Sequence, residues 1–187
     1  MPRFFFFLVT LISINSYAQD KTSYTAYNKL VEVAGTNYVM AFVQNLGKVA
    51  EEGRSLLFIE TKSGENREVS FPKNSYLEKV EQIKLDTPGI NLFIVVGRTV
   101  NLNSNKTIDW NDPRQIFVLS VDGKEKTQIT EDRYFASSWV INRQTGMIVI
   151  TGHYDSNNNG KYDKTDKAEV MVYDLKAMKT NVRISDR

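Results

Sequence analysis

The segment from Asp155 to Asp166 carries oxygen-bearing side chains at the spacing of a calcium-binding loop. Calcium prefers about six to eight oxygen ligands, which such loops supply from their first, third, fifth, seventh, ninth and twelfth positions around a glycine at the sixth. The sequence therefore predicts a calcium site, with a solvated turn of Asn, Asp and Gly as the alternative. In order, the predicted ligands are Asp155, Asn157, Asn159, Lys161 through its backbone carbonyl, Asp163 and Asp166, and Gly160 occupies the sixth position.

This loop resembles the calcium loops of EF-hand and dockerin modules. It departs from the EF-hand pattern at the twelfth position, where Asp166 stands in place of glutamate. The residues on either side of the loop are typical of strands, so the paired helices of a calcium sensor are not expected. The resemblance implies a structural ion that stiffens a hairpin.

The other chemistry-bearing residues favour a binding protein over an enzyme. His153 is the only histidine, the chain has no cysteine, and no serine lies in a G-x-S-x-G motif. Two carboxylate pairs, Glu51–Glu52 and Asp163/Asp166, are candidates to flank a glycosidic bond. We expect the first pair to be solvated and the second to hold the ion. A secreted carbohydrate- or peptide-active hydrolase of the propeller type is the alternative.

Four aromatic residues form a third candidate site. Trp110, Trp139, Tyr134 and Tyr154 could stack on a sugar or a base, as in a carbohydrate-binding module, if two or three of them were exposed and coplanar. We expect them to lie in the core, which is where lone aromatic residues in β-repeats are usually found.

The composition narrows the class of protein further. The chain has 187 residues, 41% of them hydrophobic, which suffices for one domain with a real core. Its 24 Lys and Arg against 22 Asp and Glu leave no concentrated basic face, so we expect no nucleic-acid partner. The lack of cysteine excludes disulfides and thiolate metal sites.

The first residues have the pattern of a secretory signal peptide. Arg3 precedes an apolar run that begins at Phe4, and Ser16-Tyr17-Ala18 offers a small-x-small cleavage site. The run is shorter than the roughly 20 apolar residues of a spanning helix, which is the alternative. We therefore expect residues 1–18 to be removed and the mature chain, 19–187, to be exported to the periplasm or secreted, with no membrane span.

An internal repeat organises the rest of the chain. The segment from Phe93 to Asn105 aligns without a gap on the segment from Met147 to Asn159, 54 residues later, and the register holds through the strands that follow. A weaker copy begins at Tyr38. The second copy's loop keeps the oxygen spacing, but Lys106 replaces the glycine and the first position is Asn, so we expect it to have lost its metal. That loop's spaced residues are Asn101, Asn103, Asn105, Asp109 and Asp112.

Each repeat contains four short apolar runs bounded by Gly, Asn, Asp or Pro, which predicts four strands. The predicted fold is all-β, with three four-stranded antiparallel blade-like units at approximately 24–74, 75–130 and 131–187, and a β-sandwich or barrel as the alternative. Apolar residues at helical spacing over Tyr76–Leu85 make one helix the alternative for that segment. The predicted strands are Lys29–Val33, Tyr38–Gln44, Ser55–Thr61, Arg67–Phe71, Leu77–Leu85, Leu92–Val100, Arg114–Val121, Thr127–Thr130, Ser137–Ile141, Met147–His153, Ala168–Leu175 and Thr180–Ile184.

The outer half of each repeat resembles a TolB-type β-propeller repeat. The segments QIFVLSVDGKEKTQIT and EVMVYDLKAMKTNVRIS show an apolar strand ending in Ser or Asp, a turn, and a short strand ending in Thr or Ser. The usual Ser-Pro-Asp-Gly turn is replaced by Asn142–Gly146 in the third unit. Propellers typically close with about four to eight blades, so three units predict an open arc covered by a partner or a homodimer that completes a six-blade ring. We expect an exported, non-catalytic interaction protein with a protein partner or self-association.

Overall fold

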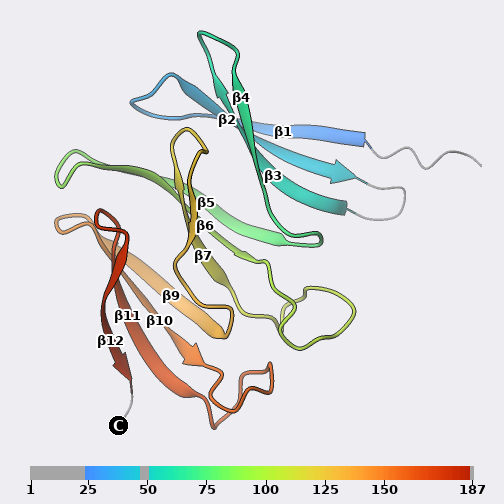
Figure 1. Cartoon of the computed structure of the whole chain (residues 1–187), viewed down its shortest axis with the longest axis vertical. Coiled ribbons are helices and arrows are strands. Elements are labelled where there is room, and N and C mark those ends of the chain that lie inside the picture. Colours follow the sequence, from blue (N-terminus) through green and yellow to red (C-terminus); the bar gives the residue numbers. More distant parts are fainter. Residues whose placement is uncertain (1–23, 47–50, 186–187) are drawn as a thin grey trace, which may run out of the picture.

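The computed structural model describes residues 24–46 and 51–185, and for residues 51–53 only the backbone. The expected signal peptide and the side chains of Glu51 and Glu52 lie outside the described part. Twelve strands make up the fold, and no helix occurs within these ranges (Figure 1). They are β1 Tyr24–Glu32, β2 Tyr38–Leu46, β3 Glu51–Glu60, β4 Asn66–Ser70, β5 Tyr76–Leu85, β6 Ile90–Arg98, β7 Gln115–Ser120, β8 Lys126–Gln128, β9 Tyr134–Asn142, β10 Met147–Tyr154, β11 Lys167–Asp174 and β12 Lys179–Ser185.

The strands form three antiparallel four-stranded sheets, each built from consecutive strands. We call them sheet 1 (β1–β4), sheet 2 (β5–β8) and sheet 3 (β9–β12). This confirms the predicted all-β class and the three four-stranded units. The helix considered over Tyr76–Leu85 is wrong, because β5 pairs along its length with β6 and its apolar residues pack between sheets.

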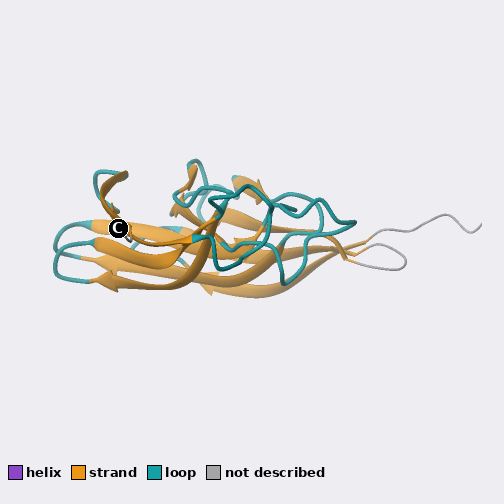
Figure 2. Ribbon diagram, turned by 90° about the horizontal axis from the view of Figure 1, so that it is seen from below, coloured by secondary structure: helices purple, strands orange, loops and turns teal. Residues whose placement is uncertain are grey.

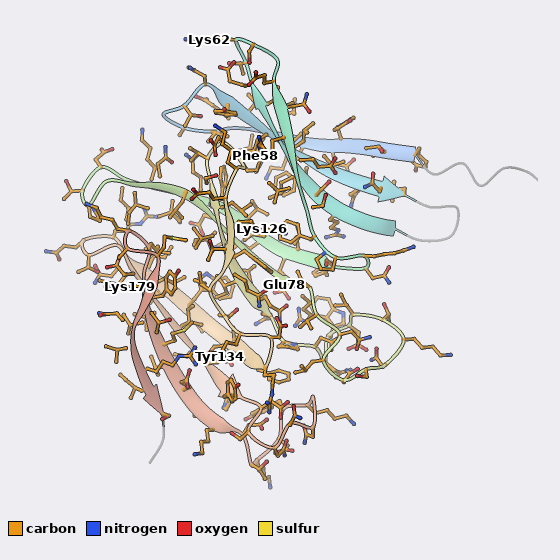
Figure 3. The ribbon with its side chains drawn as sticks, in the orientation of Figure 1. Phe58, Lys62, Glu78, Lys126, Tyr134 and Lys179 are labelled. Atoms are coloured by element: carbon orange, nitrogen blue, oxygen red, sulfur yellow. The ribbon has the colours of Figure 1, made fainter. Side chains whose placement is uncertain are left out.

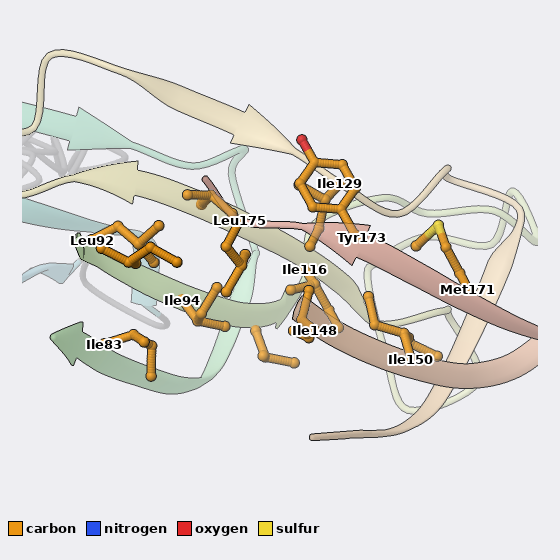
Figure 4. Packing of buried hydrophobic residues seen from close by; sticks show 14 of the residues in the cluster. Ile83, Leu92, Ile94, Ile116, Ile129, Ile148, Ile150, Met171, Tyr173 and Leu175 are labelled. Carbon is orange, nitrogen blue, oxygen red and sulfur yellow. The ribbon is translucent and has the colours of Figure 1, made fainter. Parts of the chain in front are cut away.

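Sheet 2 lies between the other two and is covered on both faces. Alternate residues of its central strands, β6 and β7, enter two different apolar clusters, and this explains why nearly every residue of β6 is buried. One cluster joins sheet 2 to sheet 3, through residues such as Ile94 and Ile148 (Figure 4). The other joins sheet 2 to sheet 1, where Phe93 meets Phe58 edge to face at 5.6 Å. A strand buried on both faces needs a continuous apolar run, as the sequence shows.

Glycine turns fix how closely the sheets approach. Gly123, in the β7–β8 turn at φ 69°, lies so near the Phe58 ring that a Cβ would be 2.5 Å from it. Gly146, in the β9–β10 turn at φ 75°, packs in the same way against Ile90 and Pro88 of sheet 2. Only glycine combines the positive φ with this close contact. The hairpin turns therefore help to lock neighbouring sheets together.

Two long connections leave the sheets at the same end of the molecule. Residues 99–114 join β6 to β7, and residues 155–166 join β10 to β11. Figure 2, seen from below, shows loops gathered beside the strands, and the close approach of Gly160 to Leu102 places these two loops against each other. The strand ends thus bring the predicted calcium loop of the third repeat beside the equivalent loop of the second.

In the described ranges 24–46 and 51–185, the structure contains no helix with the length and hydropathy needed to cross a membrane.

Candidate functional site

The loop at 155–166 begins on a fully buried carboxylate. Asp155 follows β10 directly, has 0% exposure, and accepts hydrogen bonds from the backbone N–H groups of Asn159 and Gly160, both at 3.1 Å. The backbone turns back on itself through Asn158 at φ 60° and Gly160 at φ 71°. The loop therefore winds around the first predicted ligand, as a calcium loop does.

The side chains of the third, fifth and ninth positions converge on one point. The amide nitrogens of Asn157 and Asn159 donate to Asp163 Oδ2, at 3.0 and 2.5 Å. The other Asp163 oxygen accepts from the Thr165 hydroxyl and backbone N–H, both at 2.7 Å. The Thr165 hydroxyl first, then its N–H group and Asn157, hold the pKa of Asp163 well below its usual range, so the carboxylate is ionised at neutral pH.

The twelfth position closes the loop. One Asp166 carboxylate oxygen accepts the Ser156 N–H at 3.2 Å, and the other accepts the Asp163 N–H at 2.9 Å. These bonds fasten the end of the loop to its start, the position from which a twelfth-position carboxylate completes the oxygen shell. Lys161 supplies only a backbone carbonyl in the predicted ligand set, and its side chain is exposed.

The predicted ligands of the loop at 155–166 have the oxygen atoms that a hard cation needs, but two of the side chains would have to turn to present them. No group of three or more His, Cys, Asp or Glu side chains that could hold a metal is found among residues 24–46 and 51–185. The predicted ligands are instead three carboxylates, two carboxamides and a carbonyl. The Asn157 and Asn159 carboxamides present nitrogen to Asp163, so each must turn its oxygen toward an ion. In the present arrangement the Asn157 and Asn159 N–H groups, and not their oxygens, face the Asp163 carboxylate.

Arg133 compensates the buried charge of Asp155. Its Nε lies 3.6 Å from Asp155 Oδ2, an ion pair that is too long for a hydrogen bond, and another guanidinium nitrogen donates to the Asp155 carbonyl. The Arg133 carbonyl in turn accepts the Asp155 N–H at 3.0 Å. A buried carboxylate needs such pairing because desolvation penalises its charged form.

The loop of the second repeat reproduces most of these hydrogen bonds. Asp112 accepts the N–H groups of Leu102 and Asp109, as Asp166 accepts those of Ser156 and Asp163. The amide of Asn105 donates to Asp109, as that of Asn159 does to Asp163. The repeat detected in the sequence therefore extends to loop conformation.

The two loops differ at their first and sixth positions, where the sequence predicted loss of the metal. Asn101 replaces the buried Asp155, and its Oδ1 is buried without a hydrogen-bond partner. Its amide nitrogen donates to the Asn105 carbonyl at 2.8 Å. Lys106, at the sixth position, does not adopt the positive φ of Gly160. The backbone therefore differs at the sixth position, whereas Ser104, at φ 55°, keeps the positive φ of Asn158.

A cleft of about 890 Å³ opens between the two loops and the adjoining strand ends of sheets 2 and 3. Its lining combines cationic, aromatic and carboxamide side chains with one carboxylate. The charged, aromatic and amide residues among them are Arg98, Arg114, Lys161, His153, Trp110, Tyr162, Phe135, Asn103, Asn105, Asn111 and Asp112.

One carboxylate pairs with two of the arginines that line this cleft. Glu78, on β5, forms ion pairs with both Arg98 and Arg114, the latter at 2.9 Å (Figure 3). The Arg98 side chain is 8% exposed and its Nε donates to the Asp112 carbonyl at 3.0 Å. Burial, followed by the charge of Arg114, lowers the pKa of Arg98. The two arginines thus share Glu78, and the charge of Asp112 also acts on Arg98.

The four candidate aromatic residues do not form a platform, and three of them lie in or against the core, as expected. Tyr134 is 1% exposed, and its hydroxyl donates to the backbone carbonyls of Ile150 and Glu169. Trp139 and Tyr154 pack against the core between sheets 2 and 3. Trp110 alone differs from the expectation of a core position, because 68% of its side chain is exposed at the cleft.

Three residues of the cleft were not predicted from the sequence. Tyr162 is 61% exposed and packs against His153, with ring centroids 4.4 Å apart and the ring planes tilted by 50°. Arg98 is the last residue of β6, and Arg114 comes directly before β7. Because Gly97 of β6 pairs with Gln115 of β7, the two arginines lie close together. That two arginines flank one loop is visible in the sequence, but the carboxylate between them comes from another strand.

The sequence matches no protein-family model and no characterised protein.

Proposed function

We propose that this chain is an exported, non-catalytic interaction protein whose two end sheets associate with a second copy of the chain. One observation carries the proposal: the outer face of sheet 3 presents a row of four valines across all four strands. Register places Val182 beside Val172, Val172 beside Val149, and Val149 beside Val140. Val140 is 64% exposed and Val182 is 44% exposed.

The valine row resembles the apolar sheet faces that are buried between sheet 2 and its two neighbours. Its residues alternate with Ile148, Ile150 and Met171, which point the other way into the cluster beneath sheet 2. Ile184, in the adjoining cross-strand row, is 59% exposed. A contiguous exposed apolar patch is typical of an interface.

Sheet 1 has a corresponding outer face at the opposite end. Leu30 pairs with Ala41, and Ala41 pairs with Leu57, in a row that points away from sheet 2. Leu30 is 69% exposed. Ala41 is 1% exposed and Leu57 pairs next with Glu68, so this face is apolar over three strands and ends on a carboxylate.

A second copy is the occupant that covers both faces at once. A two-fold pair brings sheet 3 of each copy against sheet 1 of the other and forms two identical interfaces, which closes a ring of six sheets. The pairing would repeat the face-to-face packing that sheet 2 already makes with both neighbours. The loop at 155–166 would hold a calcium ion that stiffens the β10–β11 connection without driving a conformational switch.

The alternative of a propeller-type hydrolase gains no support from the cleft. Glycoside hydrolysis needs two carboxylates flanking one bond. The described lining of the cleft contains a single carboxylate, Asp112, and both of its oxygens accept backbone N–H groups.

The mass in solution tests this proposal. Light scattering should give twice the mass of one chain, and Val140→Glu or Leu30→Glu should each give a folded monomer, because either end contributes to both interfaces. Both positions are largely exposed, so a charge there should cost the single chain little stability. Tyr162→Glu, an exposed apolar position outside both faces, is the control and should remain dimeric. A wild-type chain that is monomeric at all concentrations overturns the proposal.

A further inference from the structure

The cleft between the loops combines three kinds of recognition group on one surface. Arg114 and Lys161 supply positive charge, Trp110 and Tyr162 supply exposed rings, and Asn103 lies on the wall between them with the other carboxamides of its loop. Small-molecule sites typically pair an apolar platform with a few polar groups that fix orientation. The cleft volume of about 890 Å³ lies within the range of roughly 300–1,000 Å³ that is typical of small-molecule sites.

The two rings are held in place although they are exposed. The Arg98 guanidinium lies 4.6 Å from the Trp110 ring centroid, and Tyr76 packs against the same indole at 5.3 Å. On the other loop, Tyr162 rests on His153, and its hydroxyl lies 3.5 Å from His153 Nε2. Rings that are fixed before a ligand arrives lose little conformational entropy on binding.

The charge of the cleft selects an anion. Three cations, Arg98, Arg114 and Lys161, are set against two carboxylates, Glu78 and Asp112, so one positive charge remains among these groups. Lys161 is exposed at the cleft wall. Guanidinium and ammonium groups bind carboxylates through charge-assisted hydrogen bonds.

We infer that this cleft binds an acidic saccharide of the uronic acid type, with a pyranose ring against Trp110, its carboxylate toward Arg114 and Lys161, and its hydroxyls toward the carboxamides. Aromatic side chains offer a broad apolar surface to one face of such a ring. The several carboxamides favour a hydroxyl-rich ligand over a nucleic acid, for which the near-neutral chain offers no extended basic track. The site is independent of how the end sheets are covered.

Titration of the full-length chain with trigalacturonate tests the inference, with neutral galactotriose as the comparison. Tryptophan fluorescence and calorimetry should show saturable binding of the acidic trimer, at least about tenfold tighter than that of the neutral one, and weaker at high salt. Trp110→Ala should weaken binding by about tenfold or more, as loss of a central aromatic contact does. Its melting temperature reports whether the fold is retained.

A pair of lysine variants separates the cleft from general charge. Lys161→Gln should weaken trigalacturonate binding, whereas Lys164→Gln should leave it unchanged, because both are exposed lysines of one loop and only Lys161 lines the cleft. The absence of binding, equal affinity for galactotriose, or equal effects of the two lysine variants would overturn the inference. So would tighter binding of oligothymidylate, which would make the cleft a nucleic-acid site.

Discussion

Gly160 of the third repeat lies against the carbonyl oxygen of Leu102 in the second. A Cβ placed on Gly160 would be 2.7 Å from that oxygen and 3.0 Å from the Cα of Asn103. Gly160 also has φ 71°, which side chains disfavour. The glycine of the predicted calcium loop therefore has a second task, because it lets two loops of different repeats pack together and form the walls of the cleft.

Gly160→Ala should destabilise the protein more than Gly64→Ala. Both glycines have positive φ, but a Cβ on Gly64 would meet nothing within 4 Å. Gly64→Ala should thus cost about 1 kcal/mol from backbone strain alone, and Gly160→Ala an additional 1–3 kcal/mol, roughly, from overpacking. Urea unfolding of both variants measures the difference. Equal losses would show that the loops do not depend on this contact.

Calcium should raise the melting temperature, and a chelator should lower it. An ion that binds only the folded state at about 100 times its dissociation constant adds about 2.7 kcal/mol of stability. Asp166→Asn should abolish most of the rise, whereas Asp112→Asn, at the equivalent position of the second loop, should leave it intact. Each variant disturbs an equivalent pair of backbone hydrogen bonds, so the stability that each loses without calcium should be similar. A melting temperature that calcium does not change would exclude the site.

Glu78→Gln should destabilise the chain strongly. The Glu78 side chain is 17% exposed, and its removal leaves Arg98, at 8%, without its counter-charge. Breaking such a pair should cost roughly 3 kcal/mol. Glu81→Gln, on the same strand, removes an exposed ion pair with Lys79 and should cost less than about 1 kcal/mol. Chemical unfolding of the two variants compares them directly, and similar losses would contradict a stabilising role for Glu78.

Asp174→Asn should make the protein less sensitive to acid. The hydrogen bond from the Ala177 N–H, and then that from Lys176, hold the pKa of Asp174 below its ordinary value. The unfolded chain therefore takes up the proton first, so the contribution of this group is complete above a pH of about 4 and decreases as the pH falls further.

The asparagine variant keeps a turn-forming oxygen but cannot titrate in this range. Its melting temperature should fall less than that of the wild type between pH 6 and pH 2.5, because the wild type should be the more stable at pH 6 and should lose this advantage as Asp174 is protonated. Parallel decreases in the two proteins would show that Asp174 does not contribute to acid sensitivity.

Much of the fold could be predicted from local pattern. Apolar runs bounded by turn residues located all twelve strands, with ends that differ by up to five residues, and the repeat at 93 and 147 indicated that the sheets share one plan. Strands can be predicted in this way because alternating or continuous apolar residues indicate which faces of a strand are buried. Helical spacing over Tyr76–Leu85 misled because strand pairing with β6 outweighs a weak periodicity.

By itself, the sequence determined the strands, the three-sheet plan and the oxygen spacing of the loop at 155–166, because each depends on residues close together in the chain. Only the tertiary structure decided that Trp110 and Tyr162 lie at one cleft, that Glu78 joins Arg98 to Arg114, and that a valine row stays uncovered on sheet 3. These relations join different strands and repeats. They follow from strand register and from which sheet packs in the middle, and no spacing within one segment contains that information.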